Sequence, residues 1–305
     1  TTLFRSPELH RKVKPYMLRR TRKDVGLELP SVQIFQVPLE PTRLQLDLNR
    51  ALWDELELAY EQRYRYPDKP MGVMSLMVSV ADHPGLLLLS DSSIAKRLVS
   101  ELKVPRNPAS PKIEWVRDHI WARLRDNPES KVVIFSSFER MVTLLAEACE
   151  EAVREALRIR DAAGKVVRLT GAENQTQRDQ AVRAFTEGDA LVFLATEAGG
   201  RGLNLQVADT LINVDLPWNP SRVVQRIGRI RRIGSPFTDL RIYNLITEGT
   251  IDERIASVHM EKGSLFRHVI DGGKELPEGD PMGFVGRILE EEMKAREAYK
   301  QAAGE

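Results

Sequence analysis

The sequence contains almost no cysteine and no long apolar run, and both absences limit the class of protein. Cys149 is the only cysteine in 305 residues, so a disulfide framework within the chain is excluded and a place in or near the core is expected. No apolar run reaches about 18 residues, so we expect no membrane-spanning helix and no secretory signal. The remaining composition, 42% hydrophobic and 29% charged, predicts one large or two modest globular domains.

Two motifs of nucleotide hydrolysis are also missing. The chain has no G-x-x-x-x-G-K-[ST] loop to cradle a triphosphate and no D-E-x-H run for magnesium and an attacking water. It begins Thr-Thr without an initiator methionine, which suggests a piece of something longer. No metal-ligating cluster is expected on this chain alone.

Positive charge is concentrated in two segments, although 45 Lys and Arg nearly balance 44 Asp and Glu overall. Residues 1–25 hold eight basic against two acidic residues, and residues 221–241 hold six arginines against Asp239. Such segments are often solvated faces, but they are also what a phosphate backbone requires.

The second basic segment contains a predicted helix from Asn219 to Gly234. Asn219 is a good N-cap, Pro220 suits the first helical position, and Gly234 is a natural stop. Helical spacing puts one set of side chains on an open face and another on a packed face. The open face holds Gln225, Arg229 and Arg232 with Gly228 beside them, and the packed face holds Val223, Ile227 and Ile230.

Two guanidinium groups side by side suit the charge that develops on a transferring phosphoryl group. A solvated basic face is the alternative. The glycine-rich loop upstream, from Thr196 to Gly202, favours the phosphate interpretation because glycine allows close backbone approach.

From Pro111 onward, short apolar runs alternate with helical patterns. Runs that are apolar on both faces predict buried strands of a parallel sheet, and hence a doubly wound α/β domain. The predicted strands are Val132–Phe135, Val166–Leu169, Leu191–Ala195, Leu211–Val214 and Leu240–Ile246. The loops after the first four should converge on one edge of the sheet and form the ligand site. These loops carry Ser136 and Ser137, Thr170 and Gly171, Thr196 to Gly202, and Asp215 to Asn219.

The run from Gln225 to Gly234 resembles the last motif of superfamily-two helicases, in the Q-x-x-G-R-x-x-R-x-G form of the Swi/Snf family of DNA-translocating ATPases. The run from Thr196 to Gln206 resembles that family's preceding motif, usually G-G-E-G-L-N-L-Q. Arg201 stands where the family commonly has Glu, and Ser235 where it commonly has Gln. The resemblance implies a RecA-like C-terminal lobe that binds ATP and magnesium together with a first lobe, in cis or in trans, and that tracks along double-stranded DNA.

The resemblance also implies roles for particular residues. Catalysis falls to Arg229 and Arg232 as arginine fingers, with Gln225 beside them. The nucleotide lies near Glu197, Gly200, Gly202, Asn204 and Gly228. DNA lies along Ser136, Ser137, Thr196, Gly199, Arg178, Trp218 and Asn219. Two of these residues have structural alternatives. For Trp218 the alternative is packing under the start of the helix, and for Arg178 it is a salt bridge.

The flanking segments resemble the same family. Leu18, Arg19, Arg20, Lys23, Asp24, Val25, Leu29 and Pro30 match its junction between lobes. Without the resemblance, a strand over Val32–Pro38, a structural helix from Thr42 to about Tyr64, a structural His83-Pro84 turn and a linker over residues 101–111 are predicted. After residue 250 the resemblance implies a brace helix, and a helix from Met293 to Glu305 is predicted to fray.

These patterns predict three regions: a junction with a helical protrusion at 1–110, the lobe at 111–250, and brace helices at 251–305. The predicted function is the second motor lobe of a duplex DNA translocase, nuclear in a eukaryote and at the nucleoid in a bacterium or archaeon. The alternatives are a strand-separating helicase lobe and a non-enzymatic DNA- or protein-binding module. A sugar-nucleotide transferase shares the architecture, but paired arginines have no evident role there.

Overall fold

The computed structural model describes residues 29–158, 164–261 and 282–292. The basic run from Leu18 to Val25, the brace residues after Glu261 and the predicted terminal helix from Met293 lie outside the described residues.

Strands and helices alternate along most of the chain. The strands are β1 (Ser31–Leu39), β2 (Val132–Phe135), β3 (Lys165–Leu169), β4 (Ala190–Ala195), β5 (Thr210–Asn213) and β6 (Asp239–Thr247). The helices are α2 (Arg43–Glu61), α3 (Lys69–Asp82), the 3-10 helix η4 (Pro84–Leu89), α4 (Ser93–Glu101), α5 (Pro111–Asp126), α6 (Glu139–Arg158), α7 (Gln175–Thr186), α8 (Glu197–Gly200), α9 (Pro220–Ile230) and α10 (Ile251–Glu261).

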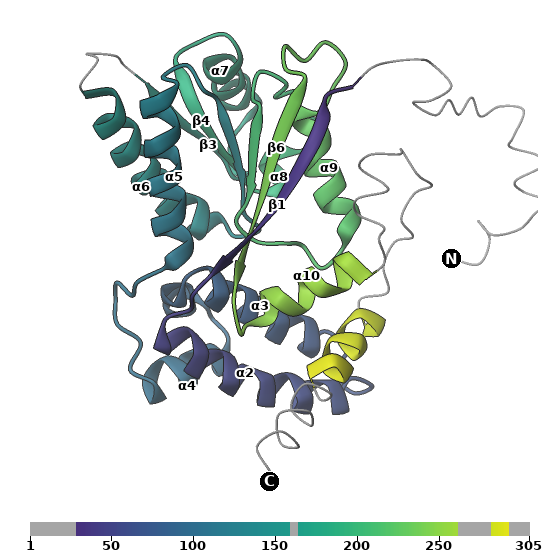
Figure 1. The fold of residues 1–305 in the computed structure, drawn as a ribbon. Helices are drawn as coiled ribbons and strands as arrows, with labels where there is room; N and C mark the ends of the chain where they lie inside the picture. Colours follow the sequence, from purple (N-terminus) through teal and green to yellow (C-terminus); the bar gives the residue numbers. More distant parts are fainter. Residues whose placement is uncertain (1–28, 159–163, 262–281, 293–305) are drawn as a thin grey trace, which may run out of the picture.

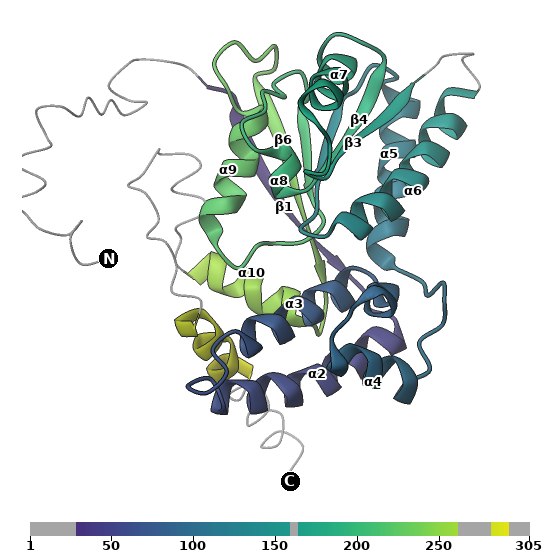
Figure 2. The same ribbon diagram turned by 180° about the vertical axis from the view of Figure 1, so that it is seen from behind.

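The six strands form one parallel sheet in the order β1-β6-β5-β2-β4-β3. Helices α5 and α6 cover one face (Figure 1), and α7, α8 and α9 cover the other (Figure 2). The predicted doubly wound α/β fold is therefore confirmed, with every predicted strand present within two residues of its expected bounds. The strand before the helical segment, β1, joins the same sheet by pairing with β6 from Ser31 to Leu39.

Burial along the strands follows their place in the sheet. Strands β2, β4 and β5 are buried at every residue, as predicted. The same prediction was wrong for β3, where Lys165 and Arg168 are exposed. Strand β3 lies at the sheet edge with β4 as its one neighbour, so its outer side meets solvent. Cys149, on α6, is fully buried as expected, and burial raises the pKa of its thiol.

A helical layer of α2, α3, α4 and α10 lies beyond the carboxyl ends of β1 and β6 (Figure 1). Helix α2 begins after Thr42, which forms a capping box with Gln45. The Thr247 hydroxyl at the end of β6 donates to the Ala81 carbonyl of α3 at 2.9 Å. The layer is thus fixed to the sheet edge where the predicted ligand loops lie.

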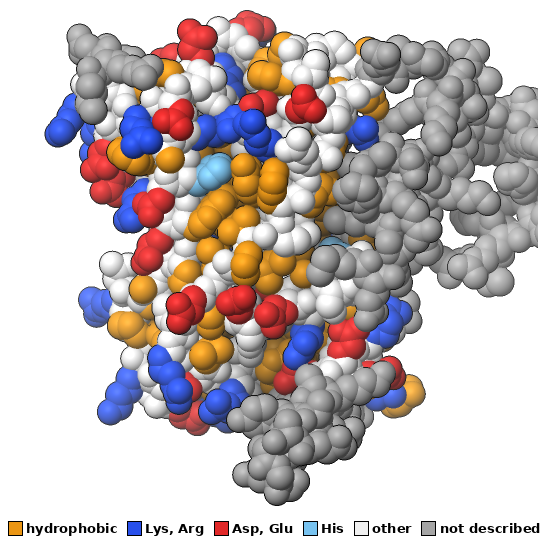
Figure 3. All heavy atoms as spheres, in the orientation of Figure 1, with side chains coloured by type: hydrophobic (Ala, Val, Ile, Leu, Met, Phe, Trp, Pro, Cys, Tyr) orange, Lys and Arg blue, Asp and Glu red, His pale blue; other side chains and the backbone are white. Residues whose placement is uncertain are grey.

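Hydrophobic side chains remain visible over β1 and β6 on the face shared with α5 (Figure 3). There Phe35 stacks on Tyr243 with ring centroids 5.0 Å apart. Phe35 is 39% exposed, so this face is only partly covered by the described residues. Among the described helices, none combines the length and hydropathy needed for a membrane span.

Candidate functional site

The predicted ligand loops do converge at the carboxyl edge of the sheet. The Ser137 hydroxyl after β2 donates to Asp215 Oδ1 at 2.5 Å, and the Ser137 N–H donates to Asp215 Oδ2 at 2.7 Å. The Thr196 hydroxyl after β4 donates to the Thr170 carbonyl after β3 at 2.6 Å. These contacts join the four loops in two pairs, β2 with β5 and β4 with β3.

Arg226 connects the loops to helix α9, and the sequence analysis missed it. Its Nη1 donates to the Asp215 carbonyl at 2.8 Å, and its Nη2 lies 3.2 Å from Asp215 Oδ1 and 3.3 Å from Glu197 Oε1. The side chain is only 3% exposed. Burial opposes the charge on Asp215, but Arg226 and the two Ser137 hydrogen bonds outweigh burial and lower the pKa of that carboxyl.

A signal for Arg226 was present in the sequence. It stands at i+3 from Val223 and beside Ile227, within the apolar stripe of the helix. An arginine on a packed face must be paired, because an isolated buried charge is very costly.

Helix α9 begins as predicted but ends earlier than Gly234. The Asn219 side chain accepts from the Ser221 N–H and Pro220 occupies the first turn. The helix ends at Ile230, because its last carbonyls find other donors. Thus the Leu205 N–H donates to the Arg229 carbonyl at 2.9 Å. The prediction that Gly234 stops the helix was wrong, and this glycine instead adopts a φ of +79° in a later turn.

The two predicted fingers consequently differ. Arg232 lies beyond the helix end, where its Nε donates to the Gly228 carbonyl and its Nη2 to the Leu203 carbonyl, both at 3.2 Å. Arg229 lies in the last turn, and within the described residues its guanidinium has no hydrogen-bond or ion-pair partner. Partial burial and the positive charges of Arg232 and Arg201 lower the pKa of Arg229.

The glycines predicted to lie near the ligands serve two purposes. A Cβ at Gly199 would lie 2.0 Å from the Leu169 carbonyl oxygen, and one at Gly200 would lie 2.5 Å from the Phe135 ring. Both glycines are thus required by internal packing. Gly202 has a φ of +76° and open space where a Cβ would stand, and Gly228 on α9 has similar open space. Of these four glycines, only Gly202 and Gly228 leave room for a ligand.

The polar residues predicted to contact DNA differ in solvent exposure. Ser137 is exposed, whereas Ser136 is fully buried and accepts from the Phe138 N–H at 3.2 Å. Thr196 is 6% exposed, and its hydroxyl caps α8 by accepting from the Gly199 N–H. Asn219 is half-buried as the α9 cap.

The remaining predicted residues are also placed. Arg178 Nη2 donates to the Arg201 carbonyl at 2.6 Å, and the salt-bridge alternative finds no carboxylate partner in the described residues. The half-buried Trp218 ring packs on Phe284 with centroids 5.9 Å apart, which fits its structural alternative. Gln225 and Asn204 are exposed.

Glu197, predicted near the nucleotide, is engaged by arginines of α9. Its Oε2 lies 2.5 Å from Arg222 Nη1, and its Oε1 faces Arg226 Nη2. The carboxylate therefore positions the helix that carries the predicted fingers.

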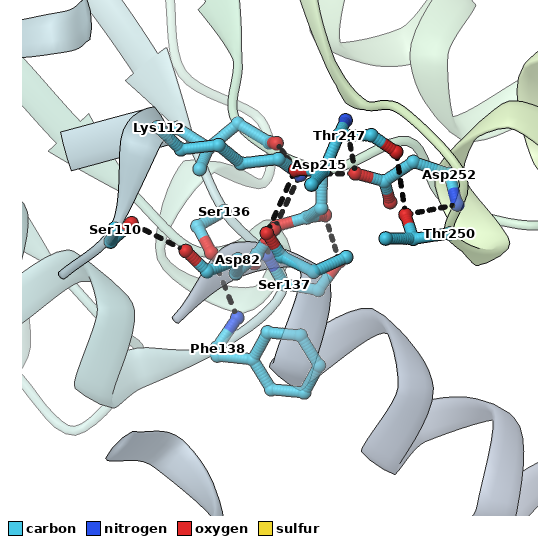
Figure 4. A network of polar contacts seen from close by, with 12 residues as sticks. Asp82, Ser110, Lys112, Ser136, Ser137, Phe138, Asp215, Thr247, Thr250 and Asp252 are labelled. Carbon is cyan, nitrogen blue, oxygen red and sulfur yellow. Dashed lines mark hydrogen bonds and ion pairs between the residues drawn. The ribbon is translucent and has the colours of Figure 1, made fainter. Parts of the chain in front are cut away.

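Beneath the loops lies a buried ionic network (Figure 4). Lys112 Nζ is 2.7 Å from Asp82 Oδ1, 2.6 Å from Asp252 Oδ2 and 2.7 Å from the Val214 carbonyl. Burial raises the pKa of Asp82 well above its usual value and also raises the pKa of Asp252, although Lys112 opposes both shifts. One lysine thus joins helix α3, the loop after β5 and helix α10.

Comparison with protein families of known type shows which class of protein domain this chain resembles. The family model described as the helicase conserved C-terminal domain matches residues 111–234. Residues 111–234 thus match the helicase C-terminal domain, and the doubly wound fold is the one seen in solved RecA-like lobes of this kind.

The relatives narrow this class. The chain is 28% identical over 276 residues to "CHD3-type chromatin-remodeling factor PICKLE" of Arabidopsis thaliana, a match covering 87% of this chain and 18% of that protein. It resembles the solved C-terminal part of the Fun30 ATPase domain with a TM-score of 0.57 and 18% identity, covering 88% of this chain and 99% of that one.

It also resembles the Sulfolobus solfataricus SWI2/SNF2 ATPase core solved in complex with double-stranded DNA. The TM-score is 0.56 at 24% identity, covering 87% of this chain and 52% of that one. The chain is thus similar, over most of its length, to proteins of the SWI/SNF type. It spans less than a third of the length of the curated relatives it matches.

Proposed function

We propose that this chain is the second motor lobe of an ATP-dependent translocase on double-stranded DNA. ATP and magnesium are held by a first RecA-like lobe, in the same polypeptide or a separate one, and Arg229 and Arg232 reach the γ-phosphate from this lobe. The match to the helicase C-terminal domain, the likeness to SWI/SNF-type relatives and the doubly wound fold support this function. A location with chromosomal DNA follows from it, nuclear or nucleoid according to the host.

One observation carries the proposal: Arg229 presents a guanidinium without a counter-charge beside open space. Among the described residues no carboxylate pairs with it, and Gly228 and Gly202 leave the adjoining volume free. A partly buried arginine without a counter-charge gains from pairing with an anion, and a guanidinium hydrogen-bonds strongly to phosphate. These residues therefore fit a phosphate group.

The rest of the site gives the lobe its geometry. Arg226 fixes α9 to the loops after β2, β4 and β5, so the position of Arg229 is set before any ligand arrives. Such preorganised charge stabilises a transition state without reorganisation at the moment of reaction. When the lobes close, Arg229 comes to the γ-phosphate and compensates the charge that develops during hydrolysis.

The same edge supplies part of a DNA track. The half-buried Arg178 is the described residue best placed to contact a backbone phosphate, since the hydroxyls of Ser136, Ser137 and Thr196 all make hydrogen bonds inside the protein. Contacts of this kind position a duplex without reading its sequence. Cycles of closing would then move this lobe along DNA.

The test is DNA-stimulated ATP hydrolysis by the protein containing both lobes. Arg229→Ala and Arg232→Ala should each remove most turnover, by about 10³-fold or more, because arginine fingers contribute roughly 10³–10⁵ in rate. Binding of ATP should be largely kept, since the first lobe holds the nucleotide.

Arg231→Ala is the matched control, because its Nε faces the Pro30 carbonyl instead of the open volume. Near-normal turnover in either finger variant would overturn the finger assignment. The 305-residue chain alone should be silent, and its turnover should appear when a Walker-containing lobe is joined or added.

Two alternatives have distinct outcomes. Unwinding in a strand-displacement assay would indicate a strand-separating helicase lobe. Silence both alone and with the first lobe, together with nucleotide-independent DNA affinity, would indicate a non-enzymatic binding module.

A further inference from the structure

Four arginines meet around the loop of residues 201–205, from three elements. Arg178 comes from α7, Arg201 directly follows α8, Arg229 lies in the last turn of α9, and Arg232 follows that helix. The Arg178 guanidinium donates to the Arg201 carbonyl at 2.6 Å, and that of Arg232 to the Leu203 carbonyl at 3.2 Å.

The charges of this cluster are not neutralised within the described part of the chain. The hydrogen bonds of Arg178 and Arg232 go to backbone carbonyls, which carry no formal charge. Across residues 29–158, 164–261 and 282–292, no ion pair within 4.0 Å involves any of the four arginines, whereas the nearby Arg222 and Arg226 are both paired.

Two carboxylates of the neighbouring loops are committed elsewhere. Glu197 pairs with the two arginines of α9 that lie outside the cluster. Glu173 Oε2 accepts a hydrogen bond from the Thr170 N–H and another from the Gly171 N–H, both at 2.9 Å. Neither is available to balance the four guanidinium groups, so the cluster carries a net positive charge and is held in place by backbone contacts.

Arg201 is the member of the cluster without a role in the proposed function. Its side chain is exposed, and Gly202 follows it with a φ of +76° and open space. Its charge acts on the Arg229 guanidinium, where it adds to the effect of Arg232. The Leu205 N–H of the same loop donates to the Arg229 carbonyl at 2.9 Å, so the loop that begins at Arg201 lies against the helix end that carries Arg229.

We propose that Arg201 binds a phosphate group at this cluster, adding a third cation to those of Arg229 and Arg232. The inference rests on the proposed function, which brings two kinds of phosphate to this lobe: the γ-phosphate of ATP and the backbone of the duplex. The shared chemistry is a phosphate oxygen accepting from a guanidinium.

The experiment uses Arg201→Gln in the two-lobed protein and measures two quantities. A nucleotide phosphate predicts a KM for ATP raised about ten-fold, with unchanged salt dependence of duplex binding. A DNA phosphate predicts an unchanged KM, with the slope of log affinity against log salt concentration reduced by about 0.9. Either result supports the assignment.

Arg154→Gln is the matched control, because it removes the same charge from an exposed position on α6, on the opposite face of the sheet. Arg201→Lys should keep part of the effect that glutamine loses. Unchanged KM and salt slope in Arg201→Gln, or changes no larger than those of the control, would overturn the inference.

Arg229→Ala, measured in parallel, separates the two proposals. Loss of turnover in Arg229→Ala with no change in Arg201→Gln leaves the function standing and rejects Arg201. Retained turnover in Arg229→Ala rejects the finger assignment, and the duplex-binding slope still tests Arg201.

Discussion

Replacing Lys112 with methionine should destabilise the protein by about 3–5 kcal/mol, the range for breaking a buried ion pair by removing one partner. Lys112 is fully buried between Asp82 and Asp252 and also donates to the Val214 carbonyl. Methionine fills much of the same volume but leaves two buried carboxylates without their cation. Asp82 Oδ2 and Asp252 Oδ1 already lack hydrogen-bond partners among the described residues, so the variant adds to a cost that is already present.

The size of this loss is checked by chemical denaturation beside Arg117→Met. Arg117 pairs with Asp118 at the surface, with side chains 43% and 68% exposed, and such pairs contribute about 0–1 kcal/mol. The free energy of unfolding of a native domain is roughly 5–15 kcal/mol, so the loss of stability in Lys112→Met should appear as a clearly lower denaturation midpoint.

The pH dependence gives the sharper test. A buried acid with a raised pKa binds more protons in the folded state, so its contribution to stability is present at low pH and lost as pH rises through the folded pKa. Without Lys112 the pKa values of Asp82 and Asp252 should rise further, because Lys112 now opposes the effect of burial. The loss should be smaller at about pH 5 than at about pH 8, and Asp82→Asn added to the variant should recover part of it. An equal loss at both pH values would refute the ionic account.

Two further predictions concern packing. Gly199→Ala should lower the unfolding midpoint, because its Cβ would lie 2.0 Å from the Leu169 carbonyl oxygen. Gly228→Ala should instead raise the free energy of unfolding by about 0.5–1 kcal/mol, since alanine stabilises a helix more than glycine where there is free space for the Cβ. A larger loss of stability at Gly228 than at Gly199 would contradict this reasoning. The Cys149 thiol should react with a thiol reagent only as fast as the protein unfolds, because it is fully buried and its pKa is raised; rapid labelling under native conditions would place it at the surface.

Local signals were sufficient for the strands and for the start of α9. Apolar runs such as Val132–Phe135 matched the observed strand because its residues are buried on both faces. Asn219 and Pro220 marked the start of α9 because capping depends on neighbours within one turn. The convergence of the loops followed from the geometry of parallel strands alone.

Features that depend on contacts between distant parts of the chain could not be predicted from the sequence. Nothing near β1 states that it pairs with β6, whose residues come far later in the chain. The end of α9 depends on Leu205, which takes the Arg229 carbonyl from another segment. Lys112 is a lysine in the first turn of a helix by sequence, and only the positions of Asp82 and Asp252 make it a buried centre of charge.

The arginines of the α9 segment show why the site could be predicted as a group but not residue by residue. By residue type Arg226, Arg229, Arg231 and Arg232 are equivalent cations, yet each meets a different environment. Arg226 is buried against Asp215, Arg231 reaches the Pro30 carbonyl and Arg232 is held by loop carbonyls. Arg229 alone among these four has no hydrogen-bond or ion-pair partner in the described residues, because the fold places Asp215, Pro30 and Leu203 beside the other three. Under the proposed function, a phosphate distinguishes these arginines through the carboxylate and carbonyl partners that the fold supplies to the other three.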